Sequence, residues 1–305
     1  METQLVLIQL ANGLQLGVLL FLVAAGLTLV FGIMDFVNLA HGAFYMLGAY
    51  ICALLAAKTG YFLPSLLLSL PLVFLLGLAV EKYLVSHLYK LGHLDHVLAT
   101  FGLILVFDTL THYLAGPDGE AILLPAYLNG SIHFGGIQLP VYRLLIICVG
   151  LLVAAVLAWG VNKTRAGMLL RAGASDREMT SALGVDIDKL YRLIFAVGAM
   201  LAGLAGALIA PISGANIAMG NEIIIIALVV VVIGGIGSIK GAFLGALFVG
   251  MIDTMGRAYM DDALKLFISP VAAESAAPAL SAMIVYIIMA LVLAIRPNGL
   301  FPASK

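Results

Sequence analysis

The chain of 305 residues is 63% hydrophobic and only 10% charged, and its mean hydropathy is +1.16. Because a soluble domain carries about 25% charged residues, this composition excludes an ordinary soluble domain and predicts an integral membrane protein. The formal net charge of −1 gives no sign of a nucleic-acid partner. Cys52 and Cys148 both lie in apolar runs, which favours two small buried side chains over a disulfide.

Nine apolar runs are candidates for membrane-spanning helices, each of which needs about 20 mostly apolar residues. The first run follows an N-terminus without the basic segment of a cleaved signal peptide, so we expect it to stay in the mature protein. The run at 222–236 is short enough to be re-entrant or broken. We therefore predict an all-α, polytopic fold with eight or nine spans, forming one transmembrane domain over residues 1–305. The candidate runs are 7–33, 37–57, 62–80, 97–115, 140–161, 190–210, 222–236, 241–258 and 279–296.

The basic residues predict the orientation of the chain. The loop 162–192 holds six of the fifteen lysines and arginines, so the positive-inside rule places it in the cytoplasm. The loop 81–96 is also basic, whereas 116–139 has no lysine or arginine and is expected outside. Arg296 and Lys305 then place the C-terminus in the cytoplasm and the N-terminus outside.

The loop 162–192 also carries the signals of a short helix. Ser175 and Glu178 fit a capping box, and Gly184 can adopt the left-handed conformation that ends a helix. The two turns between them would present three apolar side chains on one face. These are Met179, Ala182 and Leu183. Because so short a helix is marginal alone, it packs either on its own bundle or on a cytoplasmic partner.

Polar residues interrupt the apolar sequence between the first two spans. Asp35, Asn38 and His41 lie there, and a charge at the centre of a membrane costs about 2.5–3.5 kcal/mol. One interpretation is a wet cavity or translocation path, with Asn38, His41 and Tyr45 on one helix face. The other is a turn in which Asp35 or Asn38 caps a helix. The sequence supports both equally.

Small residues recur every four positions in the second half of the chain, which predicts close helix packing in lipid. One stripe is Gly198, Ala202 and Gly206, another is Gly237, Gly241 and Gly245, and a third is Ser238, Ala242, Ala246 and Gly250. A weak internal echo accompanies them, since Gly-Ala-Phe follows both His41 and Lys240 near the start of a span. Many transporters are built from such repeats.

The chemistry of an enzyme is missing from the sequence. No P-loop, His-Glu-x-x-His or Gly-x-Ser-x-Gly motif occurs, so we predict no catalytic residue, cofactor or metal ligand. His93 and His96 flank Asp95 at a membrane boundary, where an interfacial role is favoured over metal binding. Two pairs one turn apart are candidates for local ion pairs. They are Asp108 with His112 and Asp253 with Arg257.

Four stretches together resemble the Liv-type permeases of branched-chain amino acid ABC importers. They are LVFGIMDFVNLAHGAFYMLGAY, TRAGMLLRAGASDREMTSALGVDIDKL, GGIGSIKGAFLGA and RPNGLFP, in the order of that family. The resemblance implies a permease in the bacterial inner membrane that pairs with a related permease. It also implies two cytoplasmic ATPases and an extracytoplasmic solute-binding protein.

In that family the segment matching 171–184 couples the permease to the ATPase. The coupling residues implied here are Arg171, Ser175, Asp176, Arg177, Glu178, Met179, Leu183 and Gly184. We expect Met179 and Leu183 to enter a groove of the ATPase, with the two arginines facing acidic groups at its rim. A self-sufficient, ion-coupled transporter of small neutral solutes is the alternative, although only Asp108 and Asp253 offer buried carboxylates for it.

The sequence departs from the family pattern in three places. Lys240 replaces a common proline, Ala43 stands where an acidic residue is frequent, and the outer stretch 261–278 looks longer than usual. The first two touch expected path or turn positions, and the third touches the surface expected to meet the binding protein.

Overall fold

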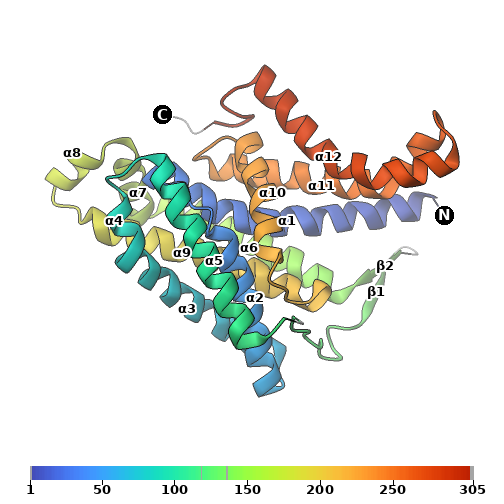
Figure 1. The fold of residues 1–305 in the computed structure, drawn as a ribbon, viewed down its shortest axis with the longest axis horizontal. Helices are drawn as coiled ribbons and strands as arrows, with labels where there is room; N and C mark the ends of the chain where they lie inside the picture. Colours follow the sequence, from blue (N-terminus) through green and yellow to red (C-terminus); the bar gives the residue numbers. More distant parts are fainter. Residues whose placement is uncertain (1, 118, 135–136, 303–305) are drawn as a thin grey trace.

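The computed structural model describes residues 2–117, 119–134 and 137–302, so Lys305 lies outside the described part. Helices dominate the fold (Figure 1). They are α1 (Glu2–Met34), α2 (His41–Thr59), α3 (Phe62–Val80), the π-helix η1 (Glu81–Val85), α4 (Ser86–Leu88), α5 (His93–Ala115), α6 (Val141–Lys163), α7 (Arg165–Ser175), α8 (Arg177–Ala182), α9 (Ile187–Ser213), α10 (Met219–Gly234), α11 (Ile239–Lys265) and α12 (Pro270–Ile295). Eight helices of the described chain are long and apolar enough to cross a membrane, and α10 is shorter. The predicted all-α, polytopic fold is confirmed.

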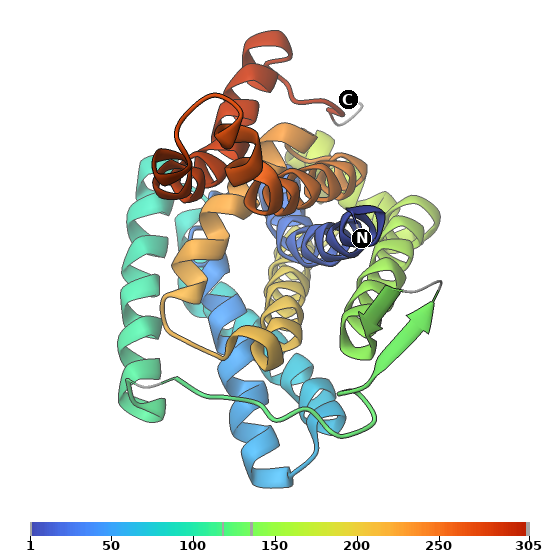
Figure 2. The ribbon, with the colours of Figure 1, turned by 90° about the vertical axis from the view of Figure 1, so that its right-hand side faces the viewer.

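The core of the bundle lies along α1 and α9. In the most apolar part of each of these helices 78% of residues are buried, whereas only 11% are buried in α12 and 17% in α6. Figure 2 shows α1 and α9 near the centre, with α5, α6 and α12 around the outside. Long apolar helices at the periphery present their outer faces to lipid, since lipid is as apolar as their side chains.

Glycines let the backbones of the central helices touch. A Cβ on Gly42 would overlap the carbonyl oxygen of Gly220, and one on Gly241 would overlap that of Gly234. The two Gly-Ala-Phe motifs lie at the starts of α2 and α11. Their glycines therefore contact the backbone at the two ends of the short helix α10. Gly237 differs from the expected stripe, because it lies in the turn before α11 with φ +80°.

Several elements differ from the sequence prediction. The stretch 261–278, expected to lie outside between two spans, is mostly helical, because α11 continues to Lys265 and α12 begins at Pro270. An antiparallel hairpin, β1 (Ser131–Phe134) with β2 (Ile137–Pro140), was not predicted. Cys148 is exposed on α6, so only Cys52 is buried as expected. The hairpin and α8 lie at opposite ends of the molecule (Figure 1).

Candidate functional site

Helix α8 begins with an aspartate cap rather than the predicted capping box. Ser175 is the last residue of α7, and the carboxylate of Asp176 accepts a hydrogen bond from the backbone N–H of Met179 at 2.9 Å. An aspartate at this position satisfies a free amide and places negative charge at the positive end of the helix. The predicted box was wrong by one residue, because α7 continues through Ser175.

The end of α8 follows the glycine signal. Gly184 has φ +86°, and its N–H donates to the carbonyl oxygen of Ser181 at 2.9 Å. The next N–H, that of Val185, donates to Thr180 at 3.3 Å. A left-handed residue with such bonds is the ordinary way to end a helix, and glycine adopts it without steric cost. Both ends of this six-residue helix are therefore capped.

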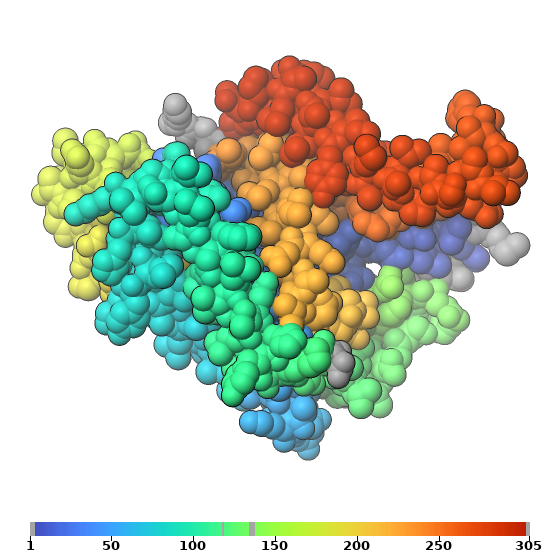
Figure 3. All heavy atoms as spheres, viewed as in Figure 1, coloured from blue at the N-terminus to red at the C-terminus, as the bar shows by residue number. Residues whose placement is uncertain are grey.

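The apolar face of α8 has no cover within the described chain. Met179 is 59% exposed and Leu183 is 78% exposed, whereas Thr180 on the inner side is buried. In the space-filling view, α7 and α8 (yellow-green) form a projection at the left edge of the molecule (Figure 3). Large apolar side chains on a projecting, polar segment are typical of a protein contact.

The two arginines expected at the rim are engaged within the chain. Arg171 donates a hydrogen bond to the carbonyl oxygen of Val161 at the end of α6. The guanidinium of Arg177 lies 4.9 Å from the ring centroid of Tyr191 and 5.7 Å from that of Tyr89, and 3.6 Å from the Asp188 carboxylate. Arginine over aromatic faces gains a cation–π attraction, so Arg177 fastens α8 to the bundle.

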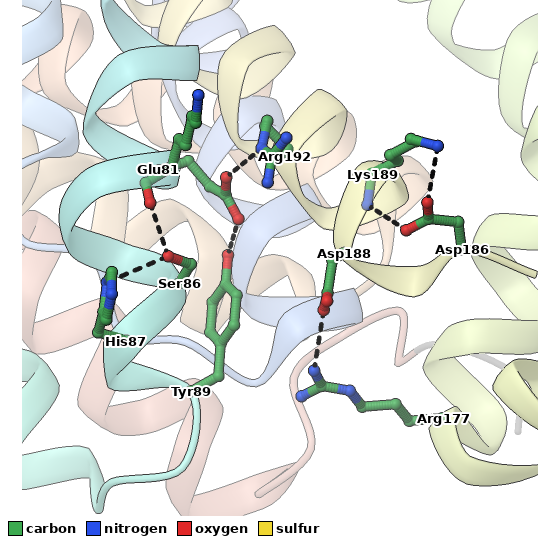
Figure 4. A network of polar contacts seen from close by, with 10 residues as sticks. Glu81, Ser86, His87, Tyr89, Arg177, Asp186, Asp188, Lys189 and Arg192 are labelled. Atoms are coloured by element: carbon green, nitrogen blue, oxygen red, sulfur yellow. Dashed lines mark hydrogen bonds and ion pairs between the residues drawn. The ribbon is translucent and has the colours of Figure 1, made fainter.

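The hydroxyl of Tyr89, whose ring faces Arg177, is bound to a buried carboxylate, that of Glu81 (Figure 4). Glu81 is 1% exposed, and its two oxygens have separate partners. Tyr89 donates its hydroxyl to Oε1 at 2.8 Å, and Nε of Arg192 donates to Oε2 at 2.9 Å. Burial, and then the nearby Glu81 carboxylate, hold the pKa of Tyr89 far above its usual value, so its hydroxyl stays protonated as a donor.

Sequence reasoning missed this network. The prediction placed Glu81 in the cytoplasmic loop 81–96, whereas the π-helix η1 continues the helical segment from Phe62 to Leu88 and Glu81 is buried in the bundle. The signal in the sequence that could have indicated a buried carboxylate is Glu81 itself, an acidic residue directly after an apolar run of nineteen residues. Elsewhere, the hydrogen bond from the Lys189 ammonium, and then the bond from the Lys189 backbone N–H, hold the pKa of the exposed Asp186 below its usual value.

The turn between α1 and α2 holds the residues expected on the path. Asn38 and His41 are each 1% exposed, and Tyr45 is 6% exposed. Neither amide atom of Asn38 has a hydrogen-bond partner in the described part of the protein, nor does Nδ1 of His41. The other ring nitrogen of His41 lies 3.0 Å from the carbonyl oxygen of Val23.

The capping interpretation of this turn does not hold. The first helical residue of α2 is His41, and the residue before it makes no side-chain cap. Asn38 therefore precedes the helix rather than sharing a helical face with His41, and its side chain caps nothing. Asp35 is exposed, has φ +49° and lies 3.8 Å from Nε2 of His93.

The other polar candidates have local roles. Nε2 of His96 lies 3.0 Å from the carbonyl oxygen of Leu88, and Asp95 accepts from the N–H of Gly92. The described residues contain no cluster of three or more metal-ligating side chains. Asp253 and Arg257 form the expected ion pair at 2.8 Å, but Asp108 accepts from Asn221 rather than pairing with His112.

Known proteins resemble this chain over most of its length. The family model described as "Branched-chain amino acid transport system / permease component" matches residues 9–293. The permease protein BraD of a high-affinity branched-chain amino acid transport system in Pseudomonas aeruginosa is 31% identical over 272 residues, 84% of this chain and 88% of BraD. LivH of Escherichia coli is 28% identical over 86% of this chain and 89% of LivH. A probable LivH of the archaeon Methanocaldococcus jannaschii is 27% identical over 80% and 79%. No solved structure matches.

These matches decide between the classes left open by the residues. They support an ABC transport permease rather than an ion-coupled transporter, and ATP hydrolysis in such systems takes place on separate subunits. The apolar helices and the bacterial relatives place the chain in the inner membrane as a multi-pass protein. The chain therefore belongs to the family of permease components of branched-chain amino acid transport systems.

Proposed function

We propose that this permease imports branched-chain or other neutral amino acids as part of a five-chain ABC assembly. Its partners are a second, related permease, two cytoplasmic ATPases and an extracytoplasmic solute-binding protein. The names of the relatives BraD and LivH support the solute class. The observation that carries the proposal is the capped helix α8 with its uncovered apolar face.

Helix α8 has the properties of a coupling helix. Burying Met179 and Leu183 in a groove of an ATPase would contribute about 1.5–3 kcal/mol each at full burial. A helix of six residues has little stability of its own, and the Asp176 cap and Gly184 stop preserve its shape before docking. Because Arg177 holds α8 against the tyrosines of the bundle, movement of the docked ATPase reaches the spans.

The turn at Asn38 borders the proposed solute path. A buried amide without partners costs about 1–3 kcal/mol, so such a group is retained where it serves another purpose. We assign that purpose to contact with solute or water when the path opens, together with His41 and Tyr45. In the present conformation all three side chains are buried from solvent. This agrees with alternating access, in which the path is never open to both sides of the membrane at once.

Reconstitution tests the proposed function. The chain is co-expressed with its partner subunits, and the purified complex is placed in liposomes with radiolabelled leucine and the binding protein on one side and ATP on the other. We expect leucine uptake that requires ATP hydrolysis and persists when ionophores collapse proton and sodium gradients. Uptake that follows an ion gradient without ATP would refute the proposal.

A further inference from the structure

Glu81 is a buried carboxylate, and both of its oxygens bind side chains of this same chain. An isolated carboxylate inside a protein is costly, and it persists only with good partners on both oxygens. Tyr89 and Arg192 supply these partners from two different segments, the loop before α5 and the first turns of α9. Glu81 itself opens the π-helix at the end of α3. One side chain therefore ties three segments together at the α8 end of the bundle (Figure 4).

On one side, this junction contacts the helix proposed to meet the ATPase. Arg177 of α8 lies over the rings of Tyr89 and Tyr191, and those two rings meet edge to face with centroids 5.5 Å apart. Because the hydroxyl of Tyr89 binds Glu81, a shift of α8 that moves the Tyr89 ring must also strain or break the bond to the carboxylate.

On the other side, the junction contacts the turn between α1 and α2. Tyr191 donates its hydroxyl to the carbonyl oxygen of Ile33 at 3.2 Å. The ring of Phe36 packs edge-on against Tyr89, with centroids 6.0 Å apart. Asn38 follows two residues later. The tyrosines thus contact both α8 and the turn that carries the unpaired amide.

We infer that Glu81 is a positioning residue for coupling: through Tyr89 and Arg192 it transmits movement of α8 to the α1–α2 turn. The inference rests on the ATPase docking proposed above. A π-helical segment suits this role, because such segments are rare and occur often at functional sites. The proposed coupling has two states: one in which Glu81 is bound to Tyr89 and Arg192, and one in which these bonds are broken.

Continuous contact is not itself coupling, so the test measures coupling directly. The variants are Glu81→Gln, which removes the charge at nearly constant shape, and Tyr89→Phe, which removes only the hydroxyl donor. The matched control is Lys189→Gln, which removes an ion pair with Asp186 on the same segment, but on the exposed surface. The readouts in liposomes are leucine imported per ATP hydrolysed and the ratio of ATPase to permease after purification.

For Glu81→Gln we expect the leucine-to-ATP ratio to fall by about ten-fold at an unchanged ATPase-to-permease ratio, within the usual range of coupling between sites. Tyr89→Phe should lower the same ratio less, and Lys189→Gln should leave it at the wild-type value. If Glu81→Gln does not fold, Tyr89→Phe decides alone. A wild-type leucine-to-ATP ratio in the folded variants overturns the inference. Failure of the docking proposal looks different, since ATPases would then copurify with a variant that lacks the apolar face of α8.

Discussion

Replacing Gly241 tests the close contact between α10 and α11. A Cβ at this position would overlap the carbonyl oxygen of Gly234 and lie 2.9 Å from that of Phe301. Both obstacles are backbone, so no side chain can turn aside, and the helices would have to separate by about 1 Å to reach ordinary contact distance. Such overpacking typically costs about 1–3 kcal/mol for an added methyl, and leucine adds more.

Gly102 provides the matched control, because it lies in the spanning helix α5 with nothing within 4 Å of its would-be Cβ. Alanine there should stabilise the helix by up to about 1 kcal/mol through its better helix propensity. The assay is thermal unfolding of the detergent-solubilised protein, followed by size-exclusion chromatography of a fluorescent fusion. We expect Gly241→Ala to lower the midpoint and Gly241→Leu to abolish the monodisperse peak. Equal midpoints for Gly241→Leu and Gly102→Leu would show that the contact carries no stability.

Three further predictions address the site. Asn38→Phe should lower leucine uptake at normal complex yield, because a bulky ring fills the proposed path; normal uptake would contradict that role. Asp176→Ala should remove the cap of α8, cost about 0.5–2 kcal/mol of local helix stability and reduce the amount of copurified ATPase. Ser175→Ala should leave the amount of copurified ATPase unchanged, and the reverse result would restore the predicted capping box. An impermeant maleimide applied to spheroplasts should label Ser131→Cys in the hairpin but not Ser175→Cys, and strong labelling of the latter would invert the orientation.

The spanning helices were predictable because lipid imposes a simple requirement. Each span must be long and apolar, so the runs at 7–33 and 190–210 mark α1 and α9 without any tertiary information. Helix ends were less predictable. The apolar run 241–258 predicted a span that ends there, but Asp261 and Lys265 pair one turn apart at 2.5 Å and α11 continues to Lys265.

In the candidate site, too, some features could be predicted from the sequence and others could not. Gly184 acts locally, so its role at the end of α8 followed from the residue type. The partners of Glu81 come from positions 89 and 192, and no local pattern connects residues so far apart in the chain. The cap of α8 depended on whether α7 ended before or after Ser175. The N–H of Asp176 still donates to the carbonyl oxygen of Ala172 at 2.9 Å, so α7 includes Ser175. Contacts between distant positions account for the missed Glu81 network, whereas the cap of α8 and the longer α11 depend on interactions between near neighbours.

The most direct test of the account is to remove the apolar face of α8. The double variant Met179→Asp/Leu183→Asp places two charges where we propose that the ATPase closes over two exposed side chains. Losing about 3 kcal/mol or more of apolar burial weakens binding by at least about a hundred-fold. Leu91→Asp, at an exposed leucine in the loop before α5, is the control.

The measurement combines ATPase copurification with ATP-dependent leucine uptake in liposomes. The account predicts that the double variant folds, loses its ATPases or its uptake, and differs in this from Leu91→Asp. A double variant that retains its ATPases and imports leucine at the wild-type rate would contradict the central claim that α8 couples ATP hydrolysis to transport.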